Sequence, residues 1–221
     1  ICMTSAVICA YKRTPFTPAN KGSLAKTRPD DLAVAVIKAL LDESKIDPAL
    51  LEDVLIGCAF PEGEQGFNIG RMAVMLAGLP DSVGGATVNR WCGSSMNAIH
   101  MAAGSIAAGA GDAFLCLGVE SMTRIPMGGF NPLPHPGLYM QRPESYMSMG
   151  LTAEAVAKHY KIDRDAQQEF ALQSHHKAAA AIQKGLDEIV ALGSTKVDEC
   201  VRADTSVEKM SELNPAFDKH G

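Results

Sequence analysis

Residues 88–96 are the most informative part of the sequence and read Val88-Asn89-Arg90-Trp91-Cys92-Gly93-Ser94-Ser95-Met96. Residues 86–91 are predicted to form a β-strand, and residues 93–108, rich in Ala, Ser, Gly and Met, a helix. Cys92 therefore lies between a strand end and a helix start, where free backbone N–H groups and the helix dipole favour an anion. Ligands of α/β sheets bind at this end of the strands. Cys92 is thus a candidate nucleophile, with a small apolar packing residue as the open alternative.

Strand and helix signals alternate on both sides of this stretch. Further strands are predicted at residues 5–11, 54–60 and 113–117, and further helices at residues 30–40 and 68–77. Four strands separated by helices predict an α/β fold, which we expect to be a mixed sheet with helices on both faces. Small residues around the whole circumference of the helix at 93–108 predict that this helix is buried.

The chain changes character after Glu120. Residues 122–149 have no period and contain five prolines, so they are predicted to form a long irregular segment. Helices are predicted beyond it at residues 152–160, 163–184 and 207–213, and a short strand at 188–192. We therefore expect two domains, an α/β domain over residues 1–120 that carries Cys92 and a second domain over residues 121–221.

Composition narrows the classes of function. A formal charge of −5 over 221 residues argues against bulk electrostatic binding to nucleic acid or anionic membranes, and no apolar stretch is long enough to cross a bilayer. The first 29 residues are basic and free of acids, as in a transit peptide, but the apolar run at residues 6–10 favours a folded start. No cysteines have metal-site spacing, and the five besides Cys92 are expected to be buried, reduced thiols: Cys2, Cys9, Cys58, Cys116 and Cys200.

Several motifs, in the order in which they occur, resemble those of the thiolases. Residues 88–96 and the Ala-rich helix behind them resemble the thiolase nucleophile motif. The stretch Glu64-Gln65-Gly66-Phe67-Asn68-Ile69-Gly70-Arg71 resembles the degradative, 3-ketoacyl-CoA type. Further matches are Arg13-Thr14-Pro15, Gly118-Val119-Glu120-Ser121-Met122, Ser148-Met149-Gly150-Leu151-Thr152-Ala153-Glu154 and Asn214-Pro215-Ala216-Phe217-Asp218. By this resemblance, residues 121–221 are the loop domain that covers the coenzyme A site, ending before the last strand of the N-terminal half.

The resemblance implies an acyltransferase. Thiolases cleave a 3-ketoacyl-CoA with free coenzyme A to acetyl-CoA and a shortened acyl-CoA, or run the reverse Claisen condensation, through an acyl-cysteine. Cys92 would be that catalytic cysteine. Met149 would line the acyl and pantetheine pocket, with Ser148 beside it at a position where many relatives have His. Arg202 would lie near the coenzyme A nucleotide, with a solvated surface arginine as the open alternative.

The resemblance also implies partners and a setting. Acyl-CoA and coenzyme A would be substrates with no permanently bound cofactor, and the assembly would be a homodimer or homotetramer. The setting would be fatty acid β-oxidation in a bacterial cytoplasm or an organellar matrix. The chain spans a little over half the usual thiolase length and lacks the family's Asn-Glu-Ala-Phe, Gly-His-Pro and Cys-x-Gly motifs. We therefore expect the C-terminal half of the fold to be absent, with another segment, a subunit or a disordered remainder covering the open face.

Because the missing motifs supply the base and the second oxyanion site, we expect Cys92 to accept an acyl group only slowly. His100, on the helix after Cys92, is expected to be buried rather than to act as a base. One alternative is a non-catalytic coenzyme A-binding or interaction protein derived from a thiolase. Another is a 3-ketoacyl synthase with acyl carrier protein as donor, whose nucleophile motif the present one does not fit.

Overall fold

The computed structural model describes residues 5–219 and divides the chain into two compact units. Unit 1 comprises the chain up to Asn131 together with Asp187–Cys200. Unit 2 comprises Pro132–Leu186 and the chain from Val201 onward. The first unit thus extends beyond Glu120 and also includes a segment from much later in the chain. The functional division into a nucleophile domain over residues 1–120 and a loop domain over residues 121–221 stays a prediction.

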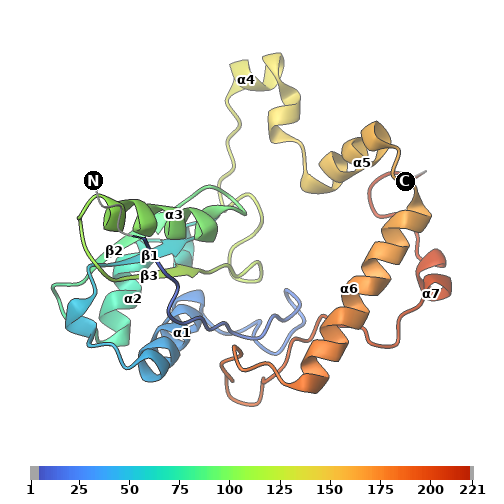
Figure 1. Cartoon of the computed structure of the whole chain (residues 1–221). Helices are drawn as coiled ribbons and strands as arrows, with labels where there is room; N and C mark the ends of the chain where they lie inside the picture. The colour runs from blue at the N-terminus through green and yellow to red at the C-terminus, as the bar shows by residue number, and fades with distance from the viewer. Residues whose placement is uncertain (1–4, 220–221) are drawn as a thin grey trace. The chain divides into compact units, whose positions relative to one another are not determined.

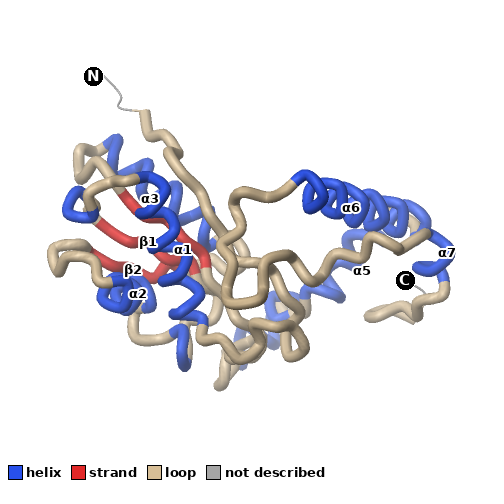
Figure 2. Tube along the Cα trace, turned by 90° about the horizontal axis from the view of Figure 1, so that it is seen from below, coloured by secondary structure: helices blue, strands red, loops and turns tan. Residues whose placement is uncertain are grey.

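Unit 1 is built on a parallel sheet of three strands, β1 (Asp53–Gly57), β2 (Gly84–Val88) and β3 (Phe114–Gly118), in the order β2-β1-β3. The last residue of β1, Gly57, pairs with Val88 and with Gly118, so the three carboxyl ends form one edge. Figure 2 shows these strands, drawn red, as a single sheet. Parallel neighbours need crossover connections, which explains the helices between them. Within the described chain the sheet is parallel throughout, rather than mixed.

Helices cover both faces of this sheet (Figure 1). The helices α1 (Pro29–Ser44) and α2 (Ile69–Ala77) share one apolar cluster with Val54 and Ile56 of β1. Between these two residues, Leu55 faces the other way and packs with Ala98 of α3 (Ser94–Ala107). The continuous apolar run of β1 is therefore explained by burial on both faces, as parallel sheets require. The predicted α/β fold with helices on both faces is confirmed.

The predicted strand at residues 5–11 is wrong. This segment is extended but belongs to no strand, and Val7 and Ile8 are 76% and 74% exposed. A strand needs a hydrogen-bonded neighbour, and the nearest pairing in the described chain is the isolated bridge between Arg13 and Ile189. The predicted short strand at 188–192 is reduced to that bridge and a second isolated one, between Leu192 and Thr195.

The predicted burial of α3 on all sides is also wrong for the described residues. Ala98 and Ala102 are buried against the sheet, whereas Met96 and Met101 are 57% and 44% exposed. His100 is exposed as well. Small residues allow a helix to pack closely on every side. In the described chain, however, only the face of α3 toward the sheet has a packing partner, so only that face is buried.

The cysteines other than Cys92 differ in burial, although all of them were expected to be buried. Cys58 is buried as expected and Cys116 is partly buried, but Cys9 and Cys200 are exposed. Cys2 lies outside the described residues. The exposed pair lies on extended or irregular chain, where no sheet or helix covers an apolar side chain.

An ion pair attaches the segment Asp187–Cys200 to the start of the chain. The guanidinium of Arg13 donates two hydrogen bonds to the Asp198 carboxylate, at 2.7 and 2.9 Å. The Phe16 N–H donates to the same carboxylate at 2.8 Å, and the Arg13 backbone exchanges hydrogen bonds with Glu188 and Val190. Hydrogen bonding to Arg13 lowers the pKa of Asp198. This ionised carboxylate therefore ties together segments 185 residues apart in the chain.

Unit 2 is helical, with α4 (Pro136–Gln141), α5 (Met149–Tyr160), α6 (Arg164–Lys184) and α7 (Val207–Ser211). Asp163 caps α6 by accepting a hydrogen bond from the Ala166 N–H at 2.8 Å, and Gly185 follows its last residue, as predicted. The stretch predicted to be irregular contains α4 and the 3₁₀ turn Pro143–Tyr146. Further 3₁₀ turns, in unit 1, are Pro48–Leu50 and Gly63–Gln65. None of the helices in the described range combines the length and the apolar character that a membrane crossing needs.

Replacing Asp198 by Asn should lower the unfolding free energy of unit 1 at pH 7 by about 1 kcal/mol, because one charge-assisted pair with Arg13 is lost. The folded-state pKa of Asp198 lies below its ordinary value of 3.8. Its contribution is therefore fully present above pH ~4 and is lost as the pH falls through 3.8 toward the folded-state pKa. Urea unfolding at pH 7 and pH 3, followed by Trp91 fluorescence, measures both effects.

The matched control is Asp187→Asn, because that exposed side chain lies outside the Arg13 pair. A variant D198N that loses stability equally at both pH values would contradict the assignment.

Candidate active site

The candidate nucleophile lies on a short turn between β2 and α3. The strand ends at Val88 and the helix begins at Ser94, so Cys92 stands where the sequence predicted it, and its thiol is exposed. Trp91, one residue before it, has a φ of 50°, in the left-handed region that bulky residues seldom adopt. Such strain persists only where neighbouring contacts hold it.

Contacts on both sides hold the Trp91 backbone in this conformation. The buried Ser94 hydroxyl donates to the Trp91 carbonyl and accepts from the Arg90 N–H at 2.9 Å. The Asn89 side chain accepts from the Trp91 N–H at 3.0 Å and donates to the Ala59 carbonyl at 3.0 Å. The Trp91 ring also meets the Phe60 ring edge to face, with centroids 5.3 Å apart. The turn before Cys92 is therefore fixed by the chain that follows β1 as well as by its own helix.

Two glycines allow α3 to approach the ends of the strands. A Cβ atom added at Gly57 would lie 2.4 Å from the backbone nitrogen of Ser95, and one at Gly118 would lie 2.7 Å from the Ser95 Cβ. Both glycines end their strands, so the first turn of α3 rests directly on the carboxyl edge of the sheet. At this helix start the Gly93 N–H donates to the Arg90 carbonyl and the Ser94 N–H to the Trp91 carbonyl, both at 3.0 Å, and the helix dipole favours negative charge there.

A polar cluster around the buried Gln65, at the same edge, was not assigned a role from the sequence. Gln65 is fully buried, and its amide donates to the Phe60 carbonyl at 2.9 Å and to Glu120 Oε1 at 2.5 Å. The Gln65 Oε1 accepts from the Ser121 N–H at 2.7 Å, and Glu120 Oε2 accepts from the Ala59 N–H at 2.7 Å. The signal available in the sequence was the placement of both residues within stretches that resemble family motifs, without any indication that they meet.

Cys58 belongs to this cluster and is chemically unlike Cys92. Its sulfur lies 3.3 Å from the Gln65 amide nitrogen. Burial, followed by the negative charge of Glu120, raises the pKa of the Cys58 thiol to about 12. Cys58 is therefore a neutral packing residue at ordinary pH, although it follows β1 as Cys92 follows β2.

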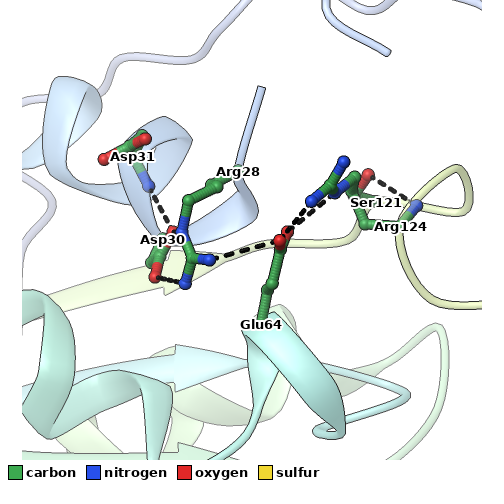
Figure 3. Close-up of polar contacts among 6 residues, drawn as sticks. All are labelled: Arg28, Asp30, Asp31, Glu64, Ser121 and Arg124. Carbon is green, nitrogen blue, oxygen red and sulfur yellow. Dashed lines mark hydrogen bonds and ion pairs between the residues drawn. The ribbon is translucent and has the colours of Figure 1, made fainter. Parts of the chain in front are cut away.

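The neighbouring Glu64 carboxylate belongs to an ion-pair group, shown in Figure 3, that adjoins the Gln65 cluster at Ser121, whose hydroxyl accepts from the Arg124 N–H at 3.4 Å. It accepts from Arg124 Nε at 2.8 Å and lies 3.2 Å from the Arg28 guanidinium, which also binds Asp30 at 2.7 and 3.0 Å. Hydrogen bonding to Arg124 lowers the pKa of Glu64. This group joins the start of α1 to the chain that follows β3.

Ser148, Met149 and Arg202, the candidate contacts for coenzyme A, all lie in unit 2. Ser148 caps α5 by accepting a hydrogen bond from the Leu151 N–H at 3.4 Å, and Met149 begins the helix with its side chain 63% exposed. The backbone N–H of Arg202 donates to His175 Nδ1 at 3.1 Å. The roles of these three residues, like that of Cys92, stay predictions. Among residues 5–219, no three or more His, Cys, Asp or Glu side chains are grouped so as to hold a metal ion.

Comparison with known proteins decides the family. The model of the thiolase N-terminal domain matches residues 6–221. The chain belongs to the thiolase family. This thiolase N-terminal domain is 42% identical to the 3-ketoacyl-CoA thiolase of Bacillus subtilis over 238 aligned residues, which cover 99% of the chain and 61% of the relative. It is 43% identical to the 3-ketoacyl-CoA thiolase of Pseudoalteromonas translucida, with coverage of 97% and 58%.

A solved structure agrees with this assignment. The crystal structure of the Bacillus anthracis acetyl-CoA acetyltransferase superposes with a TM-score of 0.84 at 32% identity. The superposition covers 98% of the present chain and 60% of that protein. The thiolase N-terminal domain thus spans about three fifths of the length of the relatives that it matches. The predicted thiolase-like fold is confirmed.

Replacing Gly57 by Ala should destabilise the thiolase N-terminal domain by about 2 kcal/mol, because the added methyl group overlaps backbone atoms of α3 that cannot move independently. The matched control is Gly104→Ala within α3, where an added Cβ meets nothing within 4 Å. That control should stabilise the helix by about 0.5–1 kcal/mol. Urea unfolding followed by Trp91 fluorescence measures both changes, and equal effects would contradict the close approach.

Iodoacetamide at pH 8 should alkylate Cys92 and leave Cys58 unmodified, because alkylation requires the thiolate and the pKa of Cys58 is about 12. Mass spectrometry of the tryptic peptides reports each site separately. In urea, Cys58 should react as readily as the exposed thiols. Modification of Cys58 in the folded protein at the rate of Cys92 would show that its burial is wrong.

Proposed function

We propose that this domain carries the acyl-accepting step of a thiolase reaction, with Cys92 as the nucleophile. In the degradative direction the Cys92 thiolate attacks the 3-keto carbon of a 3-ketoacyl-CoA. The carbon–carbon bond then breaks, and the electron pair leaves with acetyl-CoA, which takes up a proton. The shortened acyl group remains on the sulfur as a thioester. A free coenzyme A thiolate then attacks this thioester, releases the shortened acyl-CoA and restores the Cys92 thiolate.

The observation that carries the proposal is the exposed thiol of Cys92 on a strained strand-to-helix turn at the carboxyl edge of the sheet. The helix start supports the negative charge of a thiolate and then of the oxyanion on the attacked carbon. The glycines beneath α3 bring that helix start to the edge, and Gly93 leaves room beside the sulfur for a planar thioester. The family membership supports the same chemistry.

The substrate contacts are part of the proposal. Met149 suits the acyl and pantetheine portions of the substrate, since an exposed methionine adapts to apolar shapes. Ser148 contributes a hydroxyl beside it, and Arg202 contributes a cation for a phosphate of coenzyme A. A homodimer or homotetramer and a role in β-oxidation, in a bacterial cytoplasm or an organellar matrix, complete the proposal.

Incubating the chain with acetyl-CoA should add one acetyl group to the tryptic peptide that contains Cys92, since the reverse half-reaction forms the same acyl-cysteine. The adduct should form slowly without a general base, which contributes about two to four orders of magnitude in rate. Mass spectrometry of the quenched reaction measures its rate of formation. The substitution Cys92→Ala should abolish the adduct.

The matched control is Cys200→Ser, which removes another exposed thiol and should leave the Cys92 adduct unchanged. An absent adduct together with retained coenzyme A binding by calorimetry would favour the non-catalytic binding protein. Acetylation of Cys9 and Cys200 at the rate of Cys92 would show chemical reactivity without a site.

A further inference from the structure

We propose that Gln65 and Glu120 are positioning residues for the turn that carries Cys92. They act through the backbone of Ala59 and Phe60, which lies between them and the turn. The inference rests on the proposed role of Cys92, and it adds two residues that do not themselves touch the thiol.

The first step is the amide of Gln65, which joins three segments of the chain. Its nitrogen donates to the Phe60 carbonyl after β1 and to the Glu120 carboxylate after β3, while its oxygen accepts from the Ser121 N–H. The side chain has no exposed surface. A buried amide whose donors and acceptor are all satisfied specifies one arrangement of its neighbours, because any other leaves a polar group unpaired.

The second step is the short segment that follows β1. The Ala59 N–H donates to Glu120 at 2.7 Å, and the Ala59 carbonyl accepts from the Asn89 amide at 3.0 Å. Phe60 is held in the same way, with its carbonyl bound to Gln65 and its ring against Trp91. These two residues therefore have the polar cluster on one side and the turn of Cys92 on the other.

The third step is the strained residue before the nucleophile. Trp91 keeps its φ of 50° with Asn89 bound to its N–H, Ser94 bound to its carbonyl and Phe60 against its ring. Ser94 belongs to α3 and is independent of the cluster. The other two contacts pass through Ala59 and Phe60, so loss of the Gln65 and Glu120 contacts releases one side of the turn. The Cys92 sulfur then moves away from the N-terminus of α3.

The adjacent Glu64 provides a contrast within the same 3₁₀ turn. Its carboxylate binds Arg28 and Arg124 (Figure 3), whereas Ala59 and Phe60 are bound by Glu120 and Gln65. Two neighbouring side chains of nearly equal size thus have separate tasks. A change at Glu64 alters surface ion pairs, whereas a change at Gln65 alters the support of the turn.

The test uses Trp91, the single tryptophan of the chain, as a reporter beside the nucleophile. The substitution Gln65→Glu places a carboxylate against Glu120 and removes the donor to Phe60. Fluorescence should then show a shifted emission maximum and stronger acrylamide quenching. The ratio of iodoacetamide rates at Cys92 and Cys200 should fall about threefold, the size of a helix-terminus contribution. Cys9 and Cys200 serve as internal references because both are exposed.

Glu120→Gln is the second variant, for the case that a buried carboxylate prevents folding. It changes a single exposed side chain and leaves one acceptor oxygen for two N–H donors. The same changes in Trp91 emission and in the thiol ratio are expected from it. Glu64→Gln is the matched control and should leave both readouts unchanged.

An unchanged thiol ratio in Gln65→Glu and Glu120→Gln would overturn the proposal, as would equal changes in Glu64→Gln. Equal acceleration at Cys92, Cys9 and Cys200 would also overturn it, because the cluster would then stabilise the fold without positioning the turn. Neither readout requires acyl transfer. Failure of the Cys92 acetylation experiment is therefore distinguishable from failure of this inference.

Discussion

The approach of α3 to the carboxyl edge of the sheet is the constraint on which the candidate site depends. Backbone atoms of Ser95 occupy the space where any side chain at Gly57 would lie. Because interiors are close-packed, this approach cannot be relaxed by small adjustments. It brings the first turn of α3 to the strand ends, and the chain between Val88 and Ser94 must then close a short distance with a left-handed residue. The strain at Trp91 and the exposure of Cys92 both follow from that closure.

The order of elements between residues 53 and 118 could be predicted because each element has a local signature. A continuous apolar run gives β1, Gly78 ends α2, and the small-residue helix follows Cys92. The segment at residues 5–11 has an apolar signature too, but such a pattern does not specify a hydrogen-bonded neighbour. The prediction that α3 is buried on all sides failed for the same reason. Composition shows which faces of a helix can be packed closely, but it does not show which faces have a neighbouring element.

The contact between Gln65 and Glu120 could not be predicted, although both residues lie in stretches that resemble thiolase motifs. Gln65 and Glu120 are separated by 55 residues and meet only because β1 and β3 end in register. The position of Cys92 was readable because it depends on one strand and one helix that adjoin in the chain. A side chain that joins three loops depends on the tertiary register of the sheet, which no local pattern encodes.

Cys58 and Cys92 show how the surroundings at the carboxyl edge of the sheet determine the reactivity of a thiol. The two thiols follow neighbouring parallel strands, Cys58 directly after β1 and Cys92 on the turn that leads from β2 into α3. Burial and the charge of Glu120 raise the pKa of Cys58 to about 12, which keeps that sulfur neutral and allows it to pack against Gln65. The same carboxylate uses its oxygens to hold the backbone behind Cys92. Burial, reinforced by one negative charge, thus keeps the inner thiol neutral, while the hydrogen bonds of the same carboxylate hold the Ala59 backbone that Asn89 binds from the turn of Cys92.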